Sequence, residues 1–401
     1  MYIFILGRNP VLSASEIRSV FEKNNWEYEV ILESREVLIV ASEKVDVEML
    51  EKKLGGTVKI GKVEKISTMA GLEQDLDIDF FLEKILSSWD GKIQFGISVY
   101  DGGEKNVTEE LAGMIIPFSK GIKALLEQKQ KSVRFAFSRE RTLSSVVVSK
   151  NKLIQKGAEL LLIPSVDKVY IGKTLFVQEF EQFSRRDYGR PARDMKSGIM
   201  PPKLARMMIN IAKVDEGGVL LDPFCGSGTM IQEALQLGFT TIIGSDISEK
   251  AIADTQENLN WLEKIVGLDI SGVELKKEDV GDIGRNVLPE SISAIVTEPY
   301  LGPTLHNQMY PEKLQHILKE LSSLYLKAFS EFQKVLTPGG VVVMILPAFS
   351  QRNGLVFMPI IEEVERLGFK SEQIGDTKRG TVVYGNKYDF VLREIIKMRK
   401  V

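Results

Sequence analysis

The chain has 401 residues, of which 44% are hydrophobic and 27% are charged, a composition typical of a globular protein with two or three domains. No apolar run approaches the roughly 20 residues of a membrane helix, and the opening run is too short for a signal peptide, so we expect a cytoplasmic protein. The single cysteine, Cys225, excludes an intramolecular disulfide and a cysteine-based zinc site. The only histidines are His306 and His316, so we expect no histidine-ligated metal centre.

Residues 1–62 are expected to form a small α/β domain. The first helix is predicted to start at an N-cap, Ser13, with Glu16 at the capping-box position. The expected elements are a strand Tyr2–Leu6, a helix Ser13–Asn24, strands Tyr28–Leu32 and Val37–Ala41, a helix from Asp46, and a strand Val58–Ile60.

Residues 63–182 repeat this mixture and carry no catalytic motif. Both N-terminal zones are therefore interpreted as structural or substrate-positioning. The expected elements of the second zone are helices Phe80–Ser88 and Phe118–Gln128 and strands Gln94–Tyr100, Val133–Phe137, Val146–Ser149, Leu160–Ile163 and Thr174–Phe180.

Residues 183–200 form a basic connector, and residues 201–401 an α/β domain. The net charge of −3 argues mildly against a nucleic-acid partner, but the stretch from Ser184 to Arg206 is strongly basic. Pro201-Pro202 opens a helix, and strands then alternate with helices, which predicts a parallel sheet. The expected elements are strands Val219–Leu221, Thr241–Ser245, Ala294–Thr297 and Val341–Leu346, helices Met230–Leu237, Ser248–Leu262 and Lys313–Val335, and a closing hairpin of Thr381–Tyr384 and Tyr388–Ile395.

The sharpest motif is Asp222-Pro223-Phe224-Cys225-Gly226-Ser227-Gly228-Thr229, between an apolar strand and a helix. Glycines there let the backbone approach a ligand, and the helix offers free N–H groups and a positive end. Phosphate-binding patterns are absent, and Asp222 at the mouth repels phosphate but suits an amino group. The turn therefore fits S-adenosylmethionine, which carries an ammonium, a carboxylate and a sulfonium. A tight turn without a ligand and a nucleophilic Cys225 are the alternatives.

Two further motifs carry acids that can bind the same cofactor. Asp246 ends the second strand and can accept hydrogen bonds from ribose hydroxyls, or it can merely cap the next helix. In Glu278-Asp279-Val280, before the next strand, a carboxylate such as Asp279 can accept from an adenine amino group with Val280 against the ring, or it can be a plain surface acid. The fourth motif, Thr297-Glu298-Pro299-Tyr300, ends another apolar strand. Its tyrosine can stack on a flipped base, or the motif can be a turn without function.

These residues resemble class I methyltransferases that act on exocyclic amino groups of bases. The first motif is intact, whereas Thr297 stands where that family has Asp or Asn, and Glu298 where it has its first Pro. Along nearly the whole chain the sequence resembles THUMP-containing tRNA guanosine N2-methyltransferases. The segments that carry this resemblance are Met1–Arg8, Leu54–Ile60, Gly96–Tyr100, Ser132–Phe135, Tyr170–Thr174, Arg186–Pro191, Lys196–Gly198 and Pro201–Ala205.

The resemblance implies a ferredoxin-like domain over 1–62, a THUMP domain over 63–182 and a Rossmann-like methyltransferase domain over 201–401. It implies S-adenosylmethionine as cofactor and tRNA as partner, with guanosine 10 as the target. We expect the monomer as the default oligomeric state. The alternatives are a DNA amino-methyltransferase and a catalytically impaired tRNA-binding protein.

The expected site residues fall into three groups. The catalytic residues are Thr297, Glu298, Pro299 and Tyr300. The Thr297 hydroxyl and the Glu298 carbonyl are expected to orient the guanine N2 amine, with the Glu298 side chain as the second choice, and Tyr300 is expected to stack on the base. The cofactor-binding residues are Asp222, Phe224, Cys225, Gly226, Ser227, Gly228, Thr229, Asp246, Ile247, Asp279 and Val280. The RNA-binding residues are Arg185, Arg186, Arg190, Arg193 and Lys196.

Overall fold

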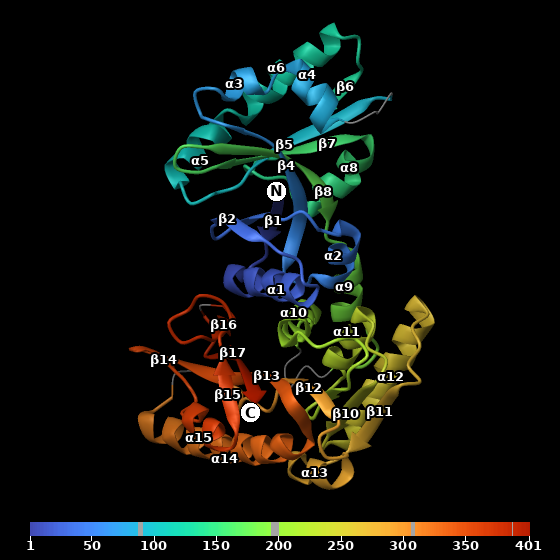
Figure 1. The fold of residues 1–401 in the computed structure, drawn as a ribbon, viewed down its shortest axis with the longest axis vertical. Helices are drawn as coiled ribbons and strands as arrows, with labels where there is room; N and C mark the ends of the chain where they lie inside the picture. The colour runs from blue at the N-terminus through green and yellow to red at the C-terminus, as the bar shows by residue number, and fades with distance from the viewer. Residues whose placement is uncertain (87–90, 194–199, 306–308, 387) are drawn as a thin grey trace. The chain divides into compact units, whose positions relative to one another are not determined.

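The computed structural model describes residues 1–86, 91–193, 200–305, 309–386 and 388–401 (Figure 1). Ser88, the segment Lys196–Gly198 and His306, which entered the sequence analysis, lie outside these residues. The chain divides into two compact units. The first unit comprises Met1–Ala14, Asn25–Lys52 and Gly56–Phe180, and the second comprises Ser15–Asn24, Lys53–Gly55 and Glu181–Val401.

The first unit is built on one sheet of eight strands in the order β2-β3-β1-β4-β8-β7-β5-β6. Strand β4 crosses the boundary expected at residue 62 and pairs with β1 on one side and β8 on the other, so one sheet runs through both expected N-terminal zones. The strands are β1 (Tyr2–Leu6), β2 (Glu29–Glu33), β3 (Val37–Ala41), β4 (Thr57–Ser67), β5 (Ile93–Val99), β6 (Val133–Phe135), β7 (Gly157–Pro164) and β8 (Val169–Val177).

Helices α3 to α6 pack against the half of this sheet that contains β5, β7 and β8. Apolar residues of α5 and α6 share a core with alternate residues of β5, including Leu111, Ile122, Phe95 and Ile97. The helices up to the end of the first sheet are α1 (Pro10–Lys23), α2 (Val47–Lys53), α3 (Leu72–Asp75), α4 (Ile78–Phe80), α5 (Lys105–Gly113), α6 (Ile115–Gln128), α7 (Ser145–Lys150) and α8 (Leu153–Lys156). The π-helical segment η1 (Phe81–Ile85) follows α4, where one continuous helix was expected.

Two expectations for the first unit are wrong. Val146–Ser149 is helical rather than extended, because Ser144 caps α7 by accepting a hydrogen bond from the amide of Val147 at 3.3 Å, and Val148 packs into a small core. Helix α1 starts at Pro10 and not at Ser13. Asn9 is its cap: its side-chain oxygen accepts from the amide of Leu12 at 3.1 Å. Proline at the first helical position was the stronger start signal.

The second unit contains a sheet in the order β11-β10-β9-β12-β13-β17-β15, with β14 beside β13 and β16 beside β17. The pairs from β11 to β13 are parallel, and β17 is antiparallel to both β13 and β15. The strands are β9 (Leu220–Asp222), β10 (Ile242–Asp246), β11 (Val273–Lys277), β12 (Ile292–Thr297), β13 (Leu336–Gln351), β14 (Gly354–Val356), β15 (Phe369–Glu372), β16 (Val382–Tyr384) and β17 (Val391–Lys400). The expected parallel sheet and closing hairpin are confirmed.

Helices cover both faces of this sheet (Figure 1). Tyr325 and Phe329 of α14 pack with Val342 and Met344, whereas α10 contacts β12 and β13. The helices of this part are α9 (Phe180–Tyr188), α10 (Pro202–Ala212), α11 (Thr229–Leu237), α12 (Glu249–Val266), the 3-10 turn η2 (Val280–Asp282), α13 (Ile283–Asn286), α14 (Pro311–Val335) and α15 (Ile361–Arg366). None of the helices in the described part of the chain has the length and apolar character needed to cross a membrane.

Candidate functional site

Three neighbouring strands of the second sheet end in the residues that the sequence singled out. Strand β9 ends at Asp222, β10 at Asp246 and β12 at Thr297. Strand β9 lies between β10 and β12 and is parallel to both, so the order of the sheet reverses at this point. Ligands of open α/β sheets bind outside the carboxyl ends of the strands at such a switch point.

Asp222 is a buried carboxyl group, 3% exposed. Its Oδ1 accepts from the Thr297 hydroxyl at 2.6 Å and from the Phe224 amide at 3.3 Å. Burial raises the pKa of this carboxyl to about 7, and the negative charges of Asp246 and Glu298 add to the rise, although both hydrogen bonds oppose it. A cationic ligand group beside Asp222 would relieve this repulsion, which an anionic group would worsen.

The affinity for S-adenosylhomocysteine should therefore depend on pH. Protonation below pH 7 removes the charge that attracts the ligand's ammonium, so we expect affinity to fall about 10-fold from about pH 8 to about pH 6. Calorimetry at both pH values measures the change. Asp222→Asn is the matched control and should bind more weakly with a nearly flat profile. An unchanged wild-type affinity would contradict the contact between Asp222 and the ammonium.

The glycine turn is shaped by two residues with left-handed backbone, Gly226 with φ of +54° and Gly228 with φ of +80°. A Cβ at Gly228 would lie 2.7 Å from Cγ2 of Thr255. The Thr255 hydroxyl donates to the Gly226 carbonyl at 2.8 Å, and the Asn258 side chain donates to the Ser227 carbonyl at 2.9 Å. Thr255 and Asn258 of helix α12 thus fix the backbone of the turn.

Cys225 belongs to the structure of this turn. Its amide donates to the Ser245 carbonyl at 2.9 Å, and burial raises the pKa of its buried thiol above the usual range. A thiolate is the nucleophilic form of cysteine, so this environment opposes a nucleophilic role.

Asp246 braces the turn rather than only capping a helix. Its Oδ2 accepts from the Gly226 amide at 3.1 Å and its Oδ1 from the Ser248 amide at 2.9 Å. The cap of α12 is Ser248, whose hydroxyl accepts from the Ala251 amide at 3.3 Å. A carboxylate has about four acceptor sites, so Asp246 retains capacity for ribose hydroxyls. Ile247, beside it, is exposed.

Asp279 and Val280, which were expected to contact adenine, already have partners within the protein. Asp279 caps the 3-10 turn η2, where its Oδ1 accepts from the Gly281 amide at 2.8 Å and pairs with Lys327 at 3.0 Å. These contacts hold the pKa of Asp279 below its usual value. Val280 packs into the core under α14, which differs from the expectation that it lies against a ring. Glu278 lies beside Asp246, since the Glu278 amide donates to the Asp246 carbonyl at 3.0 Å.

The donor set at this switch point fits S-adenosylmethionine. The glycine turn is open at Gly226, where an added Cβ would meet no atom within 4 Å. Carboxylates stand at the ends of β9 and β10, suited to an ammonium and to ribose hydroxyls. The start of helix α11, at Thr229, adds free backbone N–H groups.

The motif Thr297–Tyr300 divides into buried and open positions. Thr297 is 0% exposed and donates its hydroxyl proton to Asp222, so the expectation that this hydroxyl holds a substrate amine needs revision. Pro299 is buried as well. Glu298 is 16% exposed, and its Oε1 accepts from Nε of Arg393 on β17 at 2.5 Å.

Tyr300 presents its ring to solvent, with the residue 59% exposed. Its carbonyl accepts from the Tyr325 hydroxyl at 2.7 Å, which fixes the backbone and leaves the ring accessible. Sequence reasoning missed both Tyr325 and Arg393. They come from a helix and a strand distant in the chain, and nothing in their local sequence marked them.

Two of the arginines expected to bind RNA are buried, which corrects that expectation. Arg186 donates to Glu233 of α11 at 2.6 Å, and Arg190 lies against the start of the same helix. Arg193 is half-buried over the Tyr188 ring, with its guanidinium carbon 5.3 Å from the ring centroid. The buried carboxylate of Glu233 pairs with basic side chains inside the fold. Of the four described arginines, Arg185 alone is exposed.

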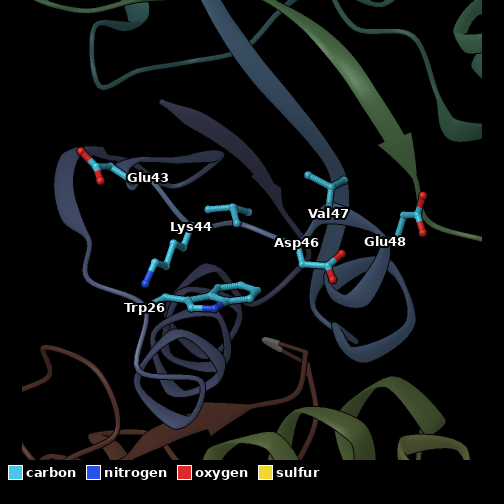
Figure 2. A pocket seen from close by; sticks show the side chains of 7 residues that line it. Trp26, Glu43, Lys44, Asp46, Val47 and Glu48 are labelled. Atoms are coloured by element: carbon cyan, nitrogen blue, oxygen red, sulfur yellow. The ribbon is translucent and has the colours of Figure 1, made fainter.

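The first unit holds an open hollow of about 620 Å³ within its own fold (Figure 2). It is lined by Trp26, Glu43, Lys44, Val45, Asp46, Val47 and Glu48. Three carboxylates against one lysine disfavour a phosphate backbone, and Asp46 already caps α2 by accepting from the Met49 amide at 2.9 Å. The lining of this hollow is therefore net negative.

Known proteins resemble this chain in sequence and in fold. Residues 190–353 match the model of an RMKL-like methyltransferase domain, and residues 89–257 match a model described as DNA methylase. A tRNA (guanine(10)-N2)-dimethyltransferase of Methanothermobacter thermautotrophicus is 25% identical over 89% of this chain and 91% of its own length. A relative of the same name from Methanocaldococcus jannaschii is 33% identical over 38% of this chain and 44% of its own length.

Among solved structures, TrmN from Thermus thermophilus aligns over 100% of this chain and 99% of its own, with a TM-score of 0.56 and 16% identity. That identity shows a shared fold alone. The resemblance to tRNA guanosine N2-methyltransferases that the sequence suggested is confirmed, and the second unit contains a class I methyltransferase domain.

Proposed function

We propose that this chain uses S-adenosylmethionine to methylate the exocyclic N2 amino group of a guanosine in RNA, with guanosine 10 of tRNA as the target. The observation that carries the proposal is the meeting of Asp222, Asp246 and the Thr297–Tyr300 motif at one switch point. Two relatives named for guanine-10 N2 methylation of tRNA support the choice of nucleotide.

The bound cofactor supplies an electrophilic methyl group. Tyr300 stacks on a guanine that has left its helix, since its exposed ring sits on a fixed backbone. Glu298, held on Oε1 by Arg393, accepts an N2 hydrogen through its other carboxylate oxygen. Methylation of N2 displaces one of its protons, and Glu298 would accept that proton. Thr297 positions Asp222 instead of touching the substrate.

The N-terminal residues are assigned to holding the RNA. We propose that residues 1–62 are ferredoxin-like and residues 63–182 a THUMP domain, although one sheet spans both. The absence of a catalytic motif before residue 183 supports this division of labour. The same proposal gives the chain a cytoplasmic location together with its tRNA.

Methyl transfer from labelled cofactor tests the proposal. Unmodified tRNA should be labelled, and digestion should release N2-methylguanosine or N2,N2-dimethylguanosine. The matched substrate carries inosine at position 10, which lacks only the 2-amino group, and should not be labelled. Labelling of the inosine tRNA would refute the assignment of N2 at position 10.

A DNA amino-methyltransferase is the second candidate, because residues 89–257 match a DNA methylase model. Duplex DNA in the same assay separates the two, since labelled DNA and unlabelled tRNA would favour this candidate. Label in neither, with cofactor binding intact, would instead favour a catalytically impaired tRNA-binding protein.

Replacing Tyr300 should test the stacking role. Tyr300→Ala removes the ring and should cost ~1–3 kcal/mol of base binding, about 5- to 150-fold in kcat/KM. Tyr300→Phe keeps the ring and should be nearly silent, because only the carbonyl of residue 300 bonds to Tyr325. Steady-state kinetics with tRNA give both values. An inactive Tyr300→Phe enzyme would show that the phenol, and not the ring face, contacts substrate or cofactor.

A further inference from the structure

Arg190 is a buried guanidinium with donors left over. It is 3% exposed, and its Nη1 donates to the hydroxyl of Thr229 at 2.5 Å. Its Nε and Nη2 are buried without a hydrogen-bond partner among the residues that the structure describes. Buried donors are normally satisfied, and a charged donor left unpaired is costlier than a neutral one.

The carboxylates that the structure describes near Arg190 do not satisfy it. Glu233 is occupied by Arg186 at 2.6 Å and by Arg206 at 2.8 Å. Asp187 acts on Arg190 only at longer range, and burial raises the pKa of its carboxyl. Arg193 brings a further positive charge. Among the described residues, these four arginines stand beside only two acids, Glu233 and Asp187, so a further anion next to Arg190 would be stabilised.

The position of Arg190 ties this anion to the glycine turn. Thr229 is the first residue of α11, a helix of nine residues whose N-cap is Gly228. Asn258 links the segment after Arg190 to the glycine turn, because its side chain donates to the carbonyls of Ala192 and Ser227, each at 2.9 Å. Its side-chain oxygen accepts from the Ala192 amide at 3.0 Å. The unpaired guanidinium edge is therefore fixed beside the free N–H groups at the start of α11.

We propose that Arg190 binds the terminal carboxylate of the cofactor's amino-acid part. This inference rests on the proposed cofactor. Nε and Nη2 form one edge of the guanidinium, and such an edge matches the two oxygens of a carboxylate. The carboxylate is the only anionic group of S-adenosylmethionine. Arg190 would then bind the carboxylate of the cofactor's amino-acid part, and Asp222 would bind its ammonium.

Calorimetry on the full-length chain with two ligands tests the proposal. The ligands are S-adenosylhomocysteine and its decarboxylated analogue, which keeps the adenosine and the ammonium. Wild type should prefer S-adenosylhomocysteine by ~30-fold, as for a charge-assisted paired hydrogen bond. Arg190→Gln should lose that preference while binding the analogue within about 3-fold of wild type. Arg190→Lys, which keeps the charge without the edge, should fall between them.

Arg185→Gln, which removes an exposed arginine of the same segment, is the matched control and should change neither affinity. Equal losses for both ligands in Arg190→Gln would overturn the proposal and make Arg190 structural. Full affinity for S-adenosylhomocysteine with weakened tRNA binding would also overturn it, in favour of a phosphate contact. Should Arg190→Gln fail to fold, a wild type without preference between the ligands would overturn it, and a preference that Arg190→Lys reduces would support it. A chain that binds neither ligand would instead fail the proposed function.

Discussion

Glu298→Gln should lower kcat about 100-fold, because a positioned group that accepts a proton contributes on the order of 100-fold or more to the rate. The substitution keeps the shape of the side chain and removes the charge that takes the N2 proton. The affinity for tRNA should change little. Single-turnover methyl transfer at saturating tRNA measures the loss, and a filter-binding titration checks the affinity.

Thr297→Val is the matched comparison in the same motif. Its hydroxyl is fully buried and donates to Asp222 at 2.6 Å, so its loss should weaken cofactor binding by a few-fold and leave kcat nearly intact at saturating cofactor. An inactive Thr297→Val enzyme beside an active Glu298→Gln enzyme would reverse these roles. The Thr297 hydroxyl would then be the amine acceptor, as the family pattern suggested.

Lys59→Met should destabilise the first unit by ~3–5 kcal/mol, the usual cost of removing one partner of a buried ion pair. Lys59 and Glu159 are both almost completely inaccessible and bonded to each other. Lys59 also donates to the Leu143 carbonyl at 2.7 Å, and Glu159 accepts from Ser98 at 2.6 Å and from Thr174 at 2.7 Å. The substitution would leave the carboxylate buried and unpaired, with its other hydrogen bonds still in place.

Urea unfolding followed by circular dichroism measures this change. Lys62→Met, at an exposed position on the same strand, is the control and should be nearly neutral. The double variant Lys59→Met/Glu159→Gln should recover part of the loss, since no unpaired charge remains. A Lys59→Met protein as stable as wild type would show that water or a shifted side chain compensates the charge.

The parts of the site that could be predicted from sequence are those that one strand end and one turn determine. Asp222 and Asp246 stand at the ends of apolar strands, and the glycines come directly after the first of these. Because the two strands are parallel, these residues meet at the same edge of the sheet. The Asp-Pro-Phe-Cys-Gly turn also carried the correct cofactor class.

The rest depended on tertiary contacts that no local pattern records. Val146–Ser149 has the β-branched composition of a strand, but a serine cap and a core contact at Val148 make it helical. Arg186 and Arg190 looked like an RNA-binding surface until α11 placed Glu233 and Thr229 against them. Arg393 is separated from Glu298 by almost a hundred residues, so its pairing became visible only when β17 was seen beside β13.

Strand β17 has a consequence for biosynthesis. It follows every other strand of its sheet in the chain, yet it lies between β13 and β15 in the interior. Until residue 400 has left the ribosome, the apolar run Val341–Leu346 of β13 has an unpaired edge, which is a site for aggregation and for chaperone binding. The methyltransferase core therefore closes after translation of β17 and not strand by strand. A nascent chain stopped before residue 391 lacks both that closing strand and Arg393, so premature termination yields a substrate for proteolysis rather than a weak enzyme.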